Sequence, residues 1–146
     1  MEKRELLHEG KAKRIYATDN SYYVVQEFKD TISAFDGAKK SVMAGKGEIN
    51  NEISCYLFEY LNNYQIPTHF VQRLSATEML VKKLEMIPIE VVMRNIAAGS
   101  LVKRYGIDEA KVLDYPIFEL YLKDDERHDP MISESFTFAL GHCTPE

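Results

Sequence analysis

The stretch IPIEVVMRNIAAGS, residues 87–100, is the most informative part of the sequence for the fold. Its first half, Ile87 to Met93, is dominated by β-branched residues, which favour pleated strands, and it predicts a buried strand. Its second half, residues 94–100, consists mostly of small or polar residues and includes Gly99 and Ser100, so we expect the strand to lead at once into a turn and a helix. The residues at the end of this strand are therefore candidates for a functional site.

The end of that strand predicts an anion-binding site. Arg94 supplies a guanidinium, which can bind phosphate or carboxylate through two parallel hydrogen bonds. Gly99 and Ser100 supply N–H groups and a hydroxyl at the start of a short helix that ends at Gly106. A sugar phosphate requires such a set of donors. A surface arginine beside an ordinary capped helix is the alternative interpretation of the same residues.

Outside this stretch, strand signals cluster and do not alternate regularly with helices. Residues 13–18 and 22–28 are rich in aromatic and β-branched residues around a polar turn and predict a β-hairpin. Further strands are expected over residues 68–73 and 117–122. This clustering predicts an α+β fold with a mainly antiparallel sheet.

Helical periodicity is clear in one place and ambiguous in another. An apolar stripe predicts a helix over about residues 48–62; its members are Ile49, Ile53, Tyr56, Leu57, Tyr60 and Leu61. Residues 75–81 have the form of a capping box, which favours a helix, but their apolar run fits a strand equally well.

Composition excludes several classes of protein. The chain of 146 residues is 45% hydrophobic and 28% charged, as expected for a globular protein. Its net charge of -5 argues against a general binder of nucleic acid or of a membrane surface, because both are polyanions. Cys55 and Cys143 have no metal-binding spacing, and no apolar run approaches the roughly 20 residues that span a bilayer. We therefore expect a cytoplasmic protein with reduced thiols.

A glycine turn with two lysines, Gly10-Lys11-Ala12-Lys13, precedes the first strand of the predicted hairpin. Glycine lets the backbone approach a ligand closely, exposed N–H groups bind phosphate oxygens, and lysine adds positive charge. The spacing is not that of a P-loop. A solvated basic strand edge is the alternative.

Two further polar stretches each have a functional and a structural interpretation. Residues 30–37 place a carboxylate in a Gly-bounded turn, and Gly45-Lys46-Gly47 places a lysine before a helix N-terminus; both could serve an anionic, aminated substrate. Taken alone, each motif favours the structural interpretation, an ordinary Asp-Gly turn and an ordinary Gly-Lys-Gly loop. Residues 122–130 combine a lysine at a strand end with several carboxylates, although charge runs are usually solvated loops.

These motifs, in this order and spacing, make the chain resemble the SAICAR synthetase family from end to end. They are GKAK at 10–13, SAFDG at 33–37, GKG at 45–47, PIEVVMRN at 88–95, AGS at 98–100, KDD at 123–125 and HDP at 128–130. The resemblance implies a two-lobed α+β fold with a mainly antiparallel sheet, distantly like kinase and ATP-grasp lobes. It implies an ATP-covering lobe over residues 1–86 and the beginning of a substrate-binding lobe over residues 87–146.

The resemblance also implies a reaction. ATP would activate the carboxylate of CAIR, carboxyaminoimidazole ribotide, as an acyl phosphate, and the amine of L-aspartate would then displace phosphate to give SAICAR in purine biosynthesis. Such chemistry depends on positioning and on neutralising crowded negative charge. By the resemblance, the ATP phosphates would lie along Gly10, Lys11, Ala12 and Lys13, with Lys82 and Met86 on the adenine side. CAIR would be held by Arg94, Ser100 and Asp129, and the catalytic residues would be Lys123 and Asp36.

The chain departs from the family pattern in two respects. Ser133 stands where the family usually has Asn, and the family continues beyond Glu146 into acidic segments that would bind Mg²⁺ with ATP. We therefore expect the main metal ligands beyond residue 146, and we expect these 146 residues to be inactive alone, with exposed apolar surface that favours self-association or a homo-oligomer. A non-catalytic nucleotide-binding fragment is the alternative function. The ligase interpretation predicts that the groups around Lys13, Arg94 and Lys123 converge on one pocket.

Overall fold

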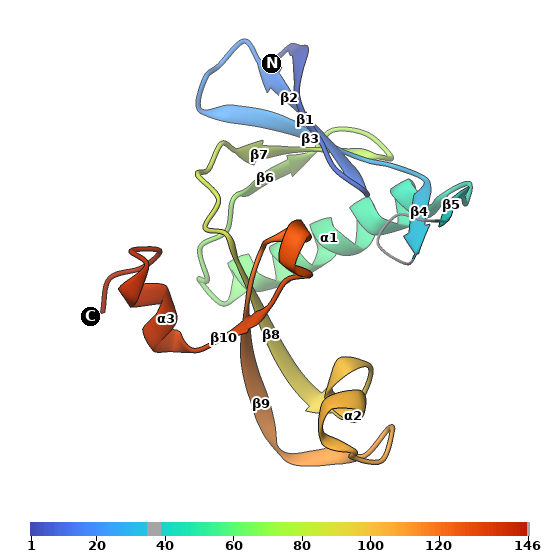
Figure 1. Ribbon diagram of the computed structural model, residues 1–146. Coiled ribbons are helices and arrows are strands. Elements are labelled where there is room, and N and C mark those ends of the chain that lie inside the picture. The colour runs from blue at the N-terminus through green and yellow to red at the C-terminus, as the bar shows by residue number, and fades with distance from the viewer. Residues whose placement is uncertain (35–38, 146) are drawn as a thin grey trace. The chain divides into compact units, whose positions relative to one another are not determined.

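The computed structural model describes residues 1–34 and 39–145, which form two compact units, Met1–Glu85 (unit 1) and Met86–Glu146 (unit 2). Both are shown in Figure 1, coloured from blue at the N-terminus to red at the C-terminus. Each unit combines antiparallel strands with helices, so the predicted α+β class is confirmed.

Unit 1 is built on a five-stranded sheet in the order β1-β2-β3-β7-β6, in which all neighbours are antiparallel. Its elements are β1 Lys3–Glu9, β2 Lys13–Thr18, β3 Tyr23–Phe28, the hairpin strands β4 Thr31–Ala34 and β5 Lys39–Val42, helix α1 Lys46–Asn63, β6 Phe70–Arg73 and β7 Glu78–Lys82. The predicted hairpin is present as β2 and β3. Strand β1 was not expected from the sequence; its residues are all exposed, and its pairing with β2 is irregular at two places.

The ambiguous residues 75–81 form a turn and strand β7. The Ser75 hydroxyl accepts hydrogen bonds from the N–H groups of Thr77 and Glu78, as in a capping box, but no helix follows. The next residues, Met79, Leu80 and Val81, are buried in the sheet. Their burial outweighs the local signal for a helix.

Helix α1 packs across one face of this sheet and is confirmed over the predicted residues. Most of the predicted apolar stripe, however, is exposed: Leu57, for example, is 51% exposed, whereas Leu61 is partly buried. The helix instead faces the sheet with Gly47, Asn51, Cys55 and Phe58, which are four or three residues apart. Asn51 is buried because its amide donates to the carbonyls of the turn before β7, at 3.0 Å to Ser75 and to Ala76.

Unit 2 contains a three-stranded antiparallel sheet in the order β10-β9-β8. Its elements are β8 Ile89–Ile96, helix α2 Ser100–Tyr105, β9 Val112–Leu122, the 3-10 turn η1 Asp125–Arg127, β10 Met131–Ile132 and helix α3 Glu134–Ala139. Helix α2 ends, as predicted, at a left-handed Gly106.

The two faces of this sheet differ in character. Strand register places Val91 opposite Leu120 and Met93 opposite Phe118 on an apolar face, where residues of α3 help to line a cavity of about 250 Å³. The expectation that residues 87–93 are buried is wrong, because Val91 and Met93 stay exposed on this partly covered face. The other face carries polar residues.

Candidate functional site

The Gly10–Lys13 turn is held in a fixed shape by hydrogen bonds. The Gly10 N–H donates to the Lys13 carbonyl at 2.9 Å, and the Lys29 N–H donates to the Ala12 carbonyl at 2.9 Å. The Lys29 ammonium also donates to the Gly10 carbonyl at 3.2 Å. Lys29, which was not predicted from the sequence to have a role, therefore holds the turn at both Gly10 and Ala12.

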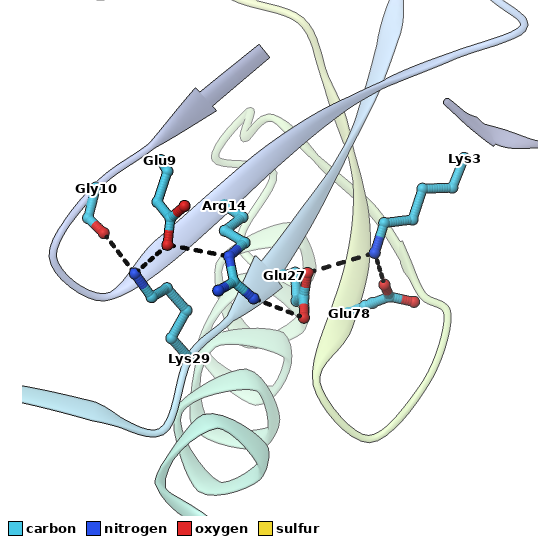
Figure 2. Close-up of polar contacts among 7 residues, drawn as sticks. All are labelled: Lys3, Glu9, Gly10, Arg14, Glu27, Lys29 and Glu78. Carbon is cyan, nitrogen blue, oxygen red and sulfur yellow. Dashed lines mark hydrogen bonds and ion pairs between the residues drawn. The ribbon is translucent and has the colours of Figure 1, made fainter. Parts of the chain in front are cut away.

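Figure 2 shows how this tie continues across the sheet as a chain of ion pairs. Glu9 accepts from the Lys29 ammonium at 2.5 Å and from Arg14 Nε at 3.1 Å. Arg14 in turn pairs with Glu27, and Glu27 and Glu78 both pair with Lys3. The hydrogen bonds from Lys29 and then from Arg14 hold the pKa of Glu9 below its ordinary value, so this carboxylate stays charged at neutral pH.

Lys13 is the lysine of the turn whose surroundings are best defined. Its ammonium lies 5.1 Å from the centroid of the Phe28 ring. Although the residue as a whole is exposed, desolvation of the ammonium lowers the pKa of Lys13. The pKa of His69 is lowered by burial and, secondarily, by the charge of Lys13. The ammonium of Lys13 is therefore within electrostatic range of His69.

His69 lines a cavity in unit 1 of about 510 Å³, which is within the usual size of small-molecule pockets. The other lining residues are Phe58, Pro67, Thr68, Lys82 and Leu84. The Thr68 hydroxyl is buried and has no hydrogen-bond partner among the residues that the structure describes. Two predicted nucleotide-binding residues, Lys13 and Lys82, thus lie at or near one hollow with an unsatisfied polar group.

The start of helix α1 is occupied by the chain's own carboxylate. Asp30 accepts from the Gly47 N–H at 2.8 Å and from the Gly45 N–H at 3.4 Å. The Lys46 ammonium donates to the Thr31 carbonyl at 3.1 Å. The structural interpretation of Asp30 and the Gly45–Gly47 loop is therefore favoured over a role in binding substrate.

In unit 2 the polar face of the sheet carries the candidate residues. Side chains two residues apart in a strand share a face, so Glu119 and Tyr121 share one, and Lys123 follows them just beyond the end of β9. The register places Glu90 opposite Tyr121 and Arg94 opposite Ile117 on this same face. A row of charged and hydroxyl groups thus runs along β8 and β9.

At one end of this row, Arg94 and Arg104 enclose Glu119. Glu119 accepts from Arg94 Nε at 2.6 Å, from the Tyr121 hydroxyl at 2.9 Å and from Arg104 Nη2. Arg94 Nη2 donates to the Ser100 hydroxyl at 3.1 Å. Burial alone would raise the pKa of Glu119, but the hydrogen bonds from Arg94 and Tyr121, with the charge of Arg104, hold it below its ordinary value.

At the other end of the row, Lys123 meets Asp129. The Lys123 ammonium donates to Asp129 at 2.6 Å and to Glu90 at 3.3 Å. The Lys123 N–H donates to the Pro88 carbonyl, and Asp129 also accepts from the Asp124 N–H at 2.9 Å. The hydrogen bond to Asp129 is the main cause that raises the pKa of Lys123. Lys123 is therefore an ammonium at neutral pH.

Comparison with known proteins identifies the family, because residues 6–146 match the family described as SAICAR synthetase. The chain belongs to the SAICAR synthetase family. A phosphoribosylaminoimidazole-succinocarboxamide synthase of Chloroherpeton thalassium is 57% identical over all 146 residues, which correspond to 62% of that relative's length. The synthase of Prosthecochloris aestuarii is 56% identical over the same share of both chains. The chain thus spans about three fifths of the length of these SAICAR synthetase relatives.

Solved structures of SAICAR synthetases have the same fold. The Ehrlichia chaffeensis synthase is 46% identical with a TM-score of 0.94, over 96% of this chain and 59% of that one. A SAICAR synthetase solved in complex with ADP is 44% identical with a TM-score of 0.89, over 94% of this chain and 58% of that one. The resemblance predicted from the sequence is therefore confirmed at the level of family and fold.

The structure describes all but one of the predicted site residues. Arg94 and Ser100 are brought into contact, as are Lys123 and Asp129. Lys11 is exposed near Lys13, Met86 is exposed at the start of unit 2, and Asp36 lies outside the described residues. The roles of all these residues stay predictions.

Three members of the cluster that Arg94 and Ser100 form were not predicted from the sequence, namely Glu119, Arg104 and Tyr121. The alternation of residues 117–122 was a usable signal, because a glutamate inside an otherwise apolar strand must be paired if it is buried. Arg104 had no such signal, because its contact with Glu119 depends on how α2 folds back.

The described part of the chain has neither a cluster of metal-binding side chains nor a membrane-spanning helix. Within residues 1–34 and 39–145, no three His, Cys, Asp or Glu side chains gather in a way that could hold a metal ion. None of the helices found there is long and apolar enough to cross a bilayer.

Proposed function

We propose that this chain supplies nucleotide-binding and CAIR-binding groups to an ATP-dependent ligase that joins L-aspartate to CAIR. The products are SAICAR, ADP and phosphate, in de novo purine biosynthesis. The observation that carries the proposal is the polar face of unit 2, where Arg94 contacts Ser100 and Lys123 contacts Asp129. Membership of the SAICAR synthetase family supports it.

Unit 1 would contribute to binding ATP. The Gly10–Lys13 turn offers N–H groups and positive charge to phosphate oxygens, and the contacts of Lys29 fix its shape before ligand arrives. The cavity that includes Lys82 and Thr68 has the size of a small-molecule site, and a purine base would lie on this side. A related SAICAR synthetase solved in complex with ADP supports the assignment of a nucleotide.

Magnesium, expected to accompany ATP, and a cytoplasmic location stay predictions.

Unit 2 would hold CAIR. Arg94 and Ser100 suit its phosphate, because a guanidinium and a hydroxyl together donate several hydrogen bonds to one anion. Lys123 would act through its charge, because a lysine with a raised pKa is a poor base at neutral pH. Its ammonium would stabilise negative charge while a CAIR carboxylate oxygen attacks the γ-phosphorus and ADP leaves. The aspartate amine then attacks the acyl carbon, and phosphate leaves as that nitrogen loses a proton.

The direct test is the substitution Arg94→Ala in the full-length protein. We expect the variant to lose CAIR affinity by about tenfold or more, because a charged hydrogen bond contributes roughly 1.5–3 kcal/mol. CAIR and ATP binding would be measured by calorimetry, and ADP release would be followed with and without aspartate. Lys103→Ala is the control, since it removes an exposed cation from the same helix as Ser100. Unchanged CAIR affinity in Arg94→Ala would refute the assignment of the site.

A non-catalytic nucleotide-binding module is the second candidate, because unit 1 has its own sheet, core and cavity. Calorimetry distinguishes the two: binding of ATP without binding of CAIR favours the module. We also expect the 146-residue chain by itself to show no turnover. Aspartate-dependent release of ADP from CAIR by that chain would contradict this expectation.

A further inference from the structure

Glu119 is a carboxylate placed where a charge is costly unless it is paired. The residue is 2% exposed, and it lies on strand β9 among groups that all donate to it. Arg94 Nε and the Tyr121 hydroxyl donate to one of its oxygens, and Arg104 Nη2 donates to the other. Each oxygen is therefore held by a different arginine, so the two guanidiniums are fixed relative to each other.

The cluster has more positive than negative charge. Two guanidiniums surround a single carboxylate, and neither arginine pairs with a second acidic group in residues 1–34 or 39–145. The Arg94 and Arg104 side chains keep some exposure to solvent, whereas the Glu119 side chain keeps almost none. The surplus positive charge is thus on the accessible side of the cluster.

The orientation of both arginines is constrained at more than one atom. Arg94 uses Nε for Glu119 and Nη2 for the Ser100 hydroxyl. Arg104 uses Nη2 for Glu119 and donates through Nη1 to the Tyr121 hydroxyl at 2.5 Å. A long side chain loses rotamer freedom when it binds a ligand, so fixing it in advance reduces the entropy lost on binding.

We propose that Glu119 is a positioning residue that orients Arg94 and Arg104, and that Arg104 is a second cationic ligand for the phosphate group that Arg94 and Ser100 bind. The identity of that ligand as CAIR rests on the proposed function. The inference about Glu119 and Arg104 applies to any sugar phosphate. Under the opposing view, the cluster only packs α2 on the sheet and its charges have no part in binding.

The substitution Glu119→Gln tests this because charge and positioning predict opposite signs. If Glu119 acted only through its charge, its neutralisation would tighten the binding of an anion nearby. If it positions the arginines, the amide cannot accept from both guanidiniums as a carboxylate does, and binding weakens. In the full-length protein we expect Glu119→Gln to weaken ribose 5-phosphate binding by about tenfold, with ribose as the uncharged reference probe.

Three further variants complete the experiment. Glu109→Gln, which removes an exposed negative charge from the same unit, should change the affinity less than about twofold. Glu119→Asp keeps the charge and should recover part of the loss. Arg104→Lys keeps the positive charge but removes the planar guanidinium, which can donate two parallel hydrogen bonds. It should weaken ribose 5-phosphate binding several-fold while ATP binding is unchanged. If Glu119→Gln does not fold, as judged by circular dichroism, Glu119→Asp tests the positioning role and Arg104→Lys still tests Arg104 as a ligand.

The outcomes separate this inference from the proposed function. Unchanged or tighter ribose 5-phosphate binding by a folded Glu119→Gln would overturn the positioning role, even if the protein forms ADP in the presence of CAIR and aspartate. Unchanged binding by Arg104→Lys would overturn the role of Arg104 as a ligand. If the wild type binds ribose 5-phosphate with the expected penalties but shows no CAIR-dependent ADP release, the proposed function fails and the inference stands.

Discussion

Gly47, in the first turn of helix α1, lies close to the end of strand β3. A Cβ atom added there would lie 2.6 Å from the Phe28 carbonyl oxygen and 3.2 Å from the Asp30 carboxylate. Both neighbours are fixed, the first as backbone and the second by its bond to the Gly47 N–H. We expect Gly47→Ala to lower the free energy of unfolding by about 1–3 kcal/mol, because overpacking forces the backbone to shift.

Chemical denaturation followed by circular dichroism would measure this effect. Glu52→Ala, an exposed change on the same helix, is the control and should stay within about 0.5 kcal/mol of the wild type. Equal stability of Gly47→Ala and the control would show that the helix can move away from the sheet without loss.

The Thr68 hydroxyl gives a prediction of the opposite sign. It is buried without a hydrogen-bond partner in the part of the chain that the structure describes. The isosteric change Thr68→Val should therefore raise the free energy of unfolding of the ligand-free protein by about 1 kcal/mol, because an unsatisfied polar group is removed. A lower melting temperature for this variant would mean that the hydroxyl has a partner after all.

For single residues, the sequence was informative where polar groups follow a known local motif. Arg94 and Ser100 could be predicted because a guanidinium at a strand end and a serine at a helix start are both visible in the order of residues. The pairing of Glu119 with two arginines could not, because sequence does not say which polar residue of a strand is covered by a returning helix. For the same reason, Asp30 could not be recognised as the partner of the Gly45 and Gly47 N–H groups.

Among the elements, helix α1 is the one whose packing differs most from expectation. Periodicity correctly predicted the helix, but it could not predict which face meets the sheet. Small residues at Gly47 and Cys55 allow close approach, and Asn51 satisfies the carbonyls of the turn before β7. Most of the apolar stripe therefore faces away from the sheet and is exposed to solvent.

This arrangement predicts that the outer face of α1 contributes to association and not to stability. Leu57→Gln should change the free energy of unfolding by no more than about 0.5 kcal/mol, because the side chain is already exposed. It should also reduce self-association and hydrophobic-dye binding by the 146-residue chain. Val81→Ala, on the buried side of the sheet, is the contrast and should cost about 2 kcal/mol. A large loss of stability in Leu57→Gln would mean that the stripe is covered within the chain.

Strand β8 shows the same limit of sequence reasoning. Its β-branched residues predicted a strand correctly, because strand propensity is a local property of the chain. Burial is not local, because it depends on what covers each face of the sheet, and residues such as Val91 and Met93 stay exposed. Tertiary packing likewise decided that residues 78–82 are a strand.

For the whole molecule, paired carboxylates predict sensitivity to acid. Burial alone would raise the pKa of Glu119 from its ordinary value of 4.5, but the hydrogen bonds from Arg94 and Tyr121, together with the charges of Arg104 and Arg94, lower it. A carboxyl with a lower pKa in the folded state stabilises the fold above its unfolded pKa and loses this contribution as pH falls through the folded value. Stability should therefore decline as pH falls below about 4.5.

Unfolding measured from pH 6 to pH 3 would test this, by circular dichroism since the chain has no Trp. The difference in stability between wild type and Glu119→Gln should be largest near pH 6 and should shrink toward pH 3. Glu109→Gln should show no such trend. A difference that stays constant over the whole range would show that ionisation of Glu119 does not contribute to stability.

Strand β1, at the edge of the unit 1 sheet, also affects how copies of the molecule can meet. Its residues are exposed, most of them are charged or polar, and its pairing with β2 is irregular at two places. An incoming strand could extend the sheet there only by desolvating lysine, arginine and glutamate side chains and by matching a distorted edge. Contact between copies through the apolar side of α1 should thus yield amorphous or small discrete assemblies, and ordered growth of fibrils from this edge is disfavoured.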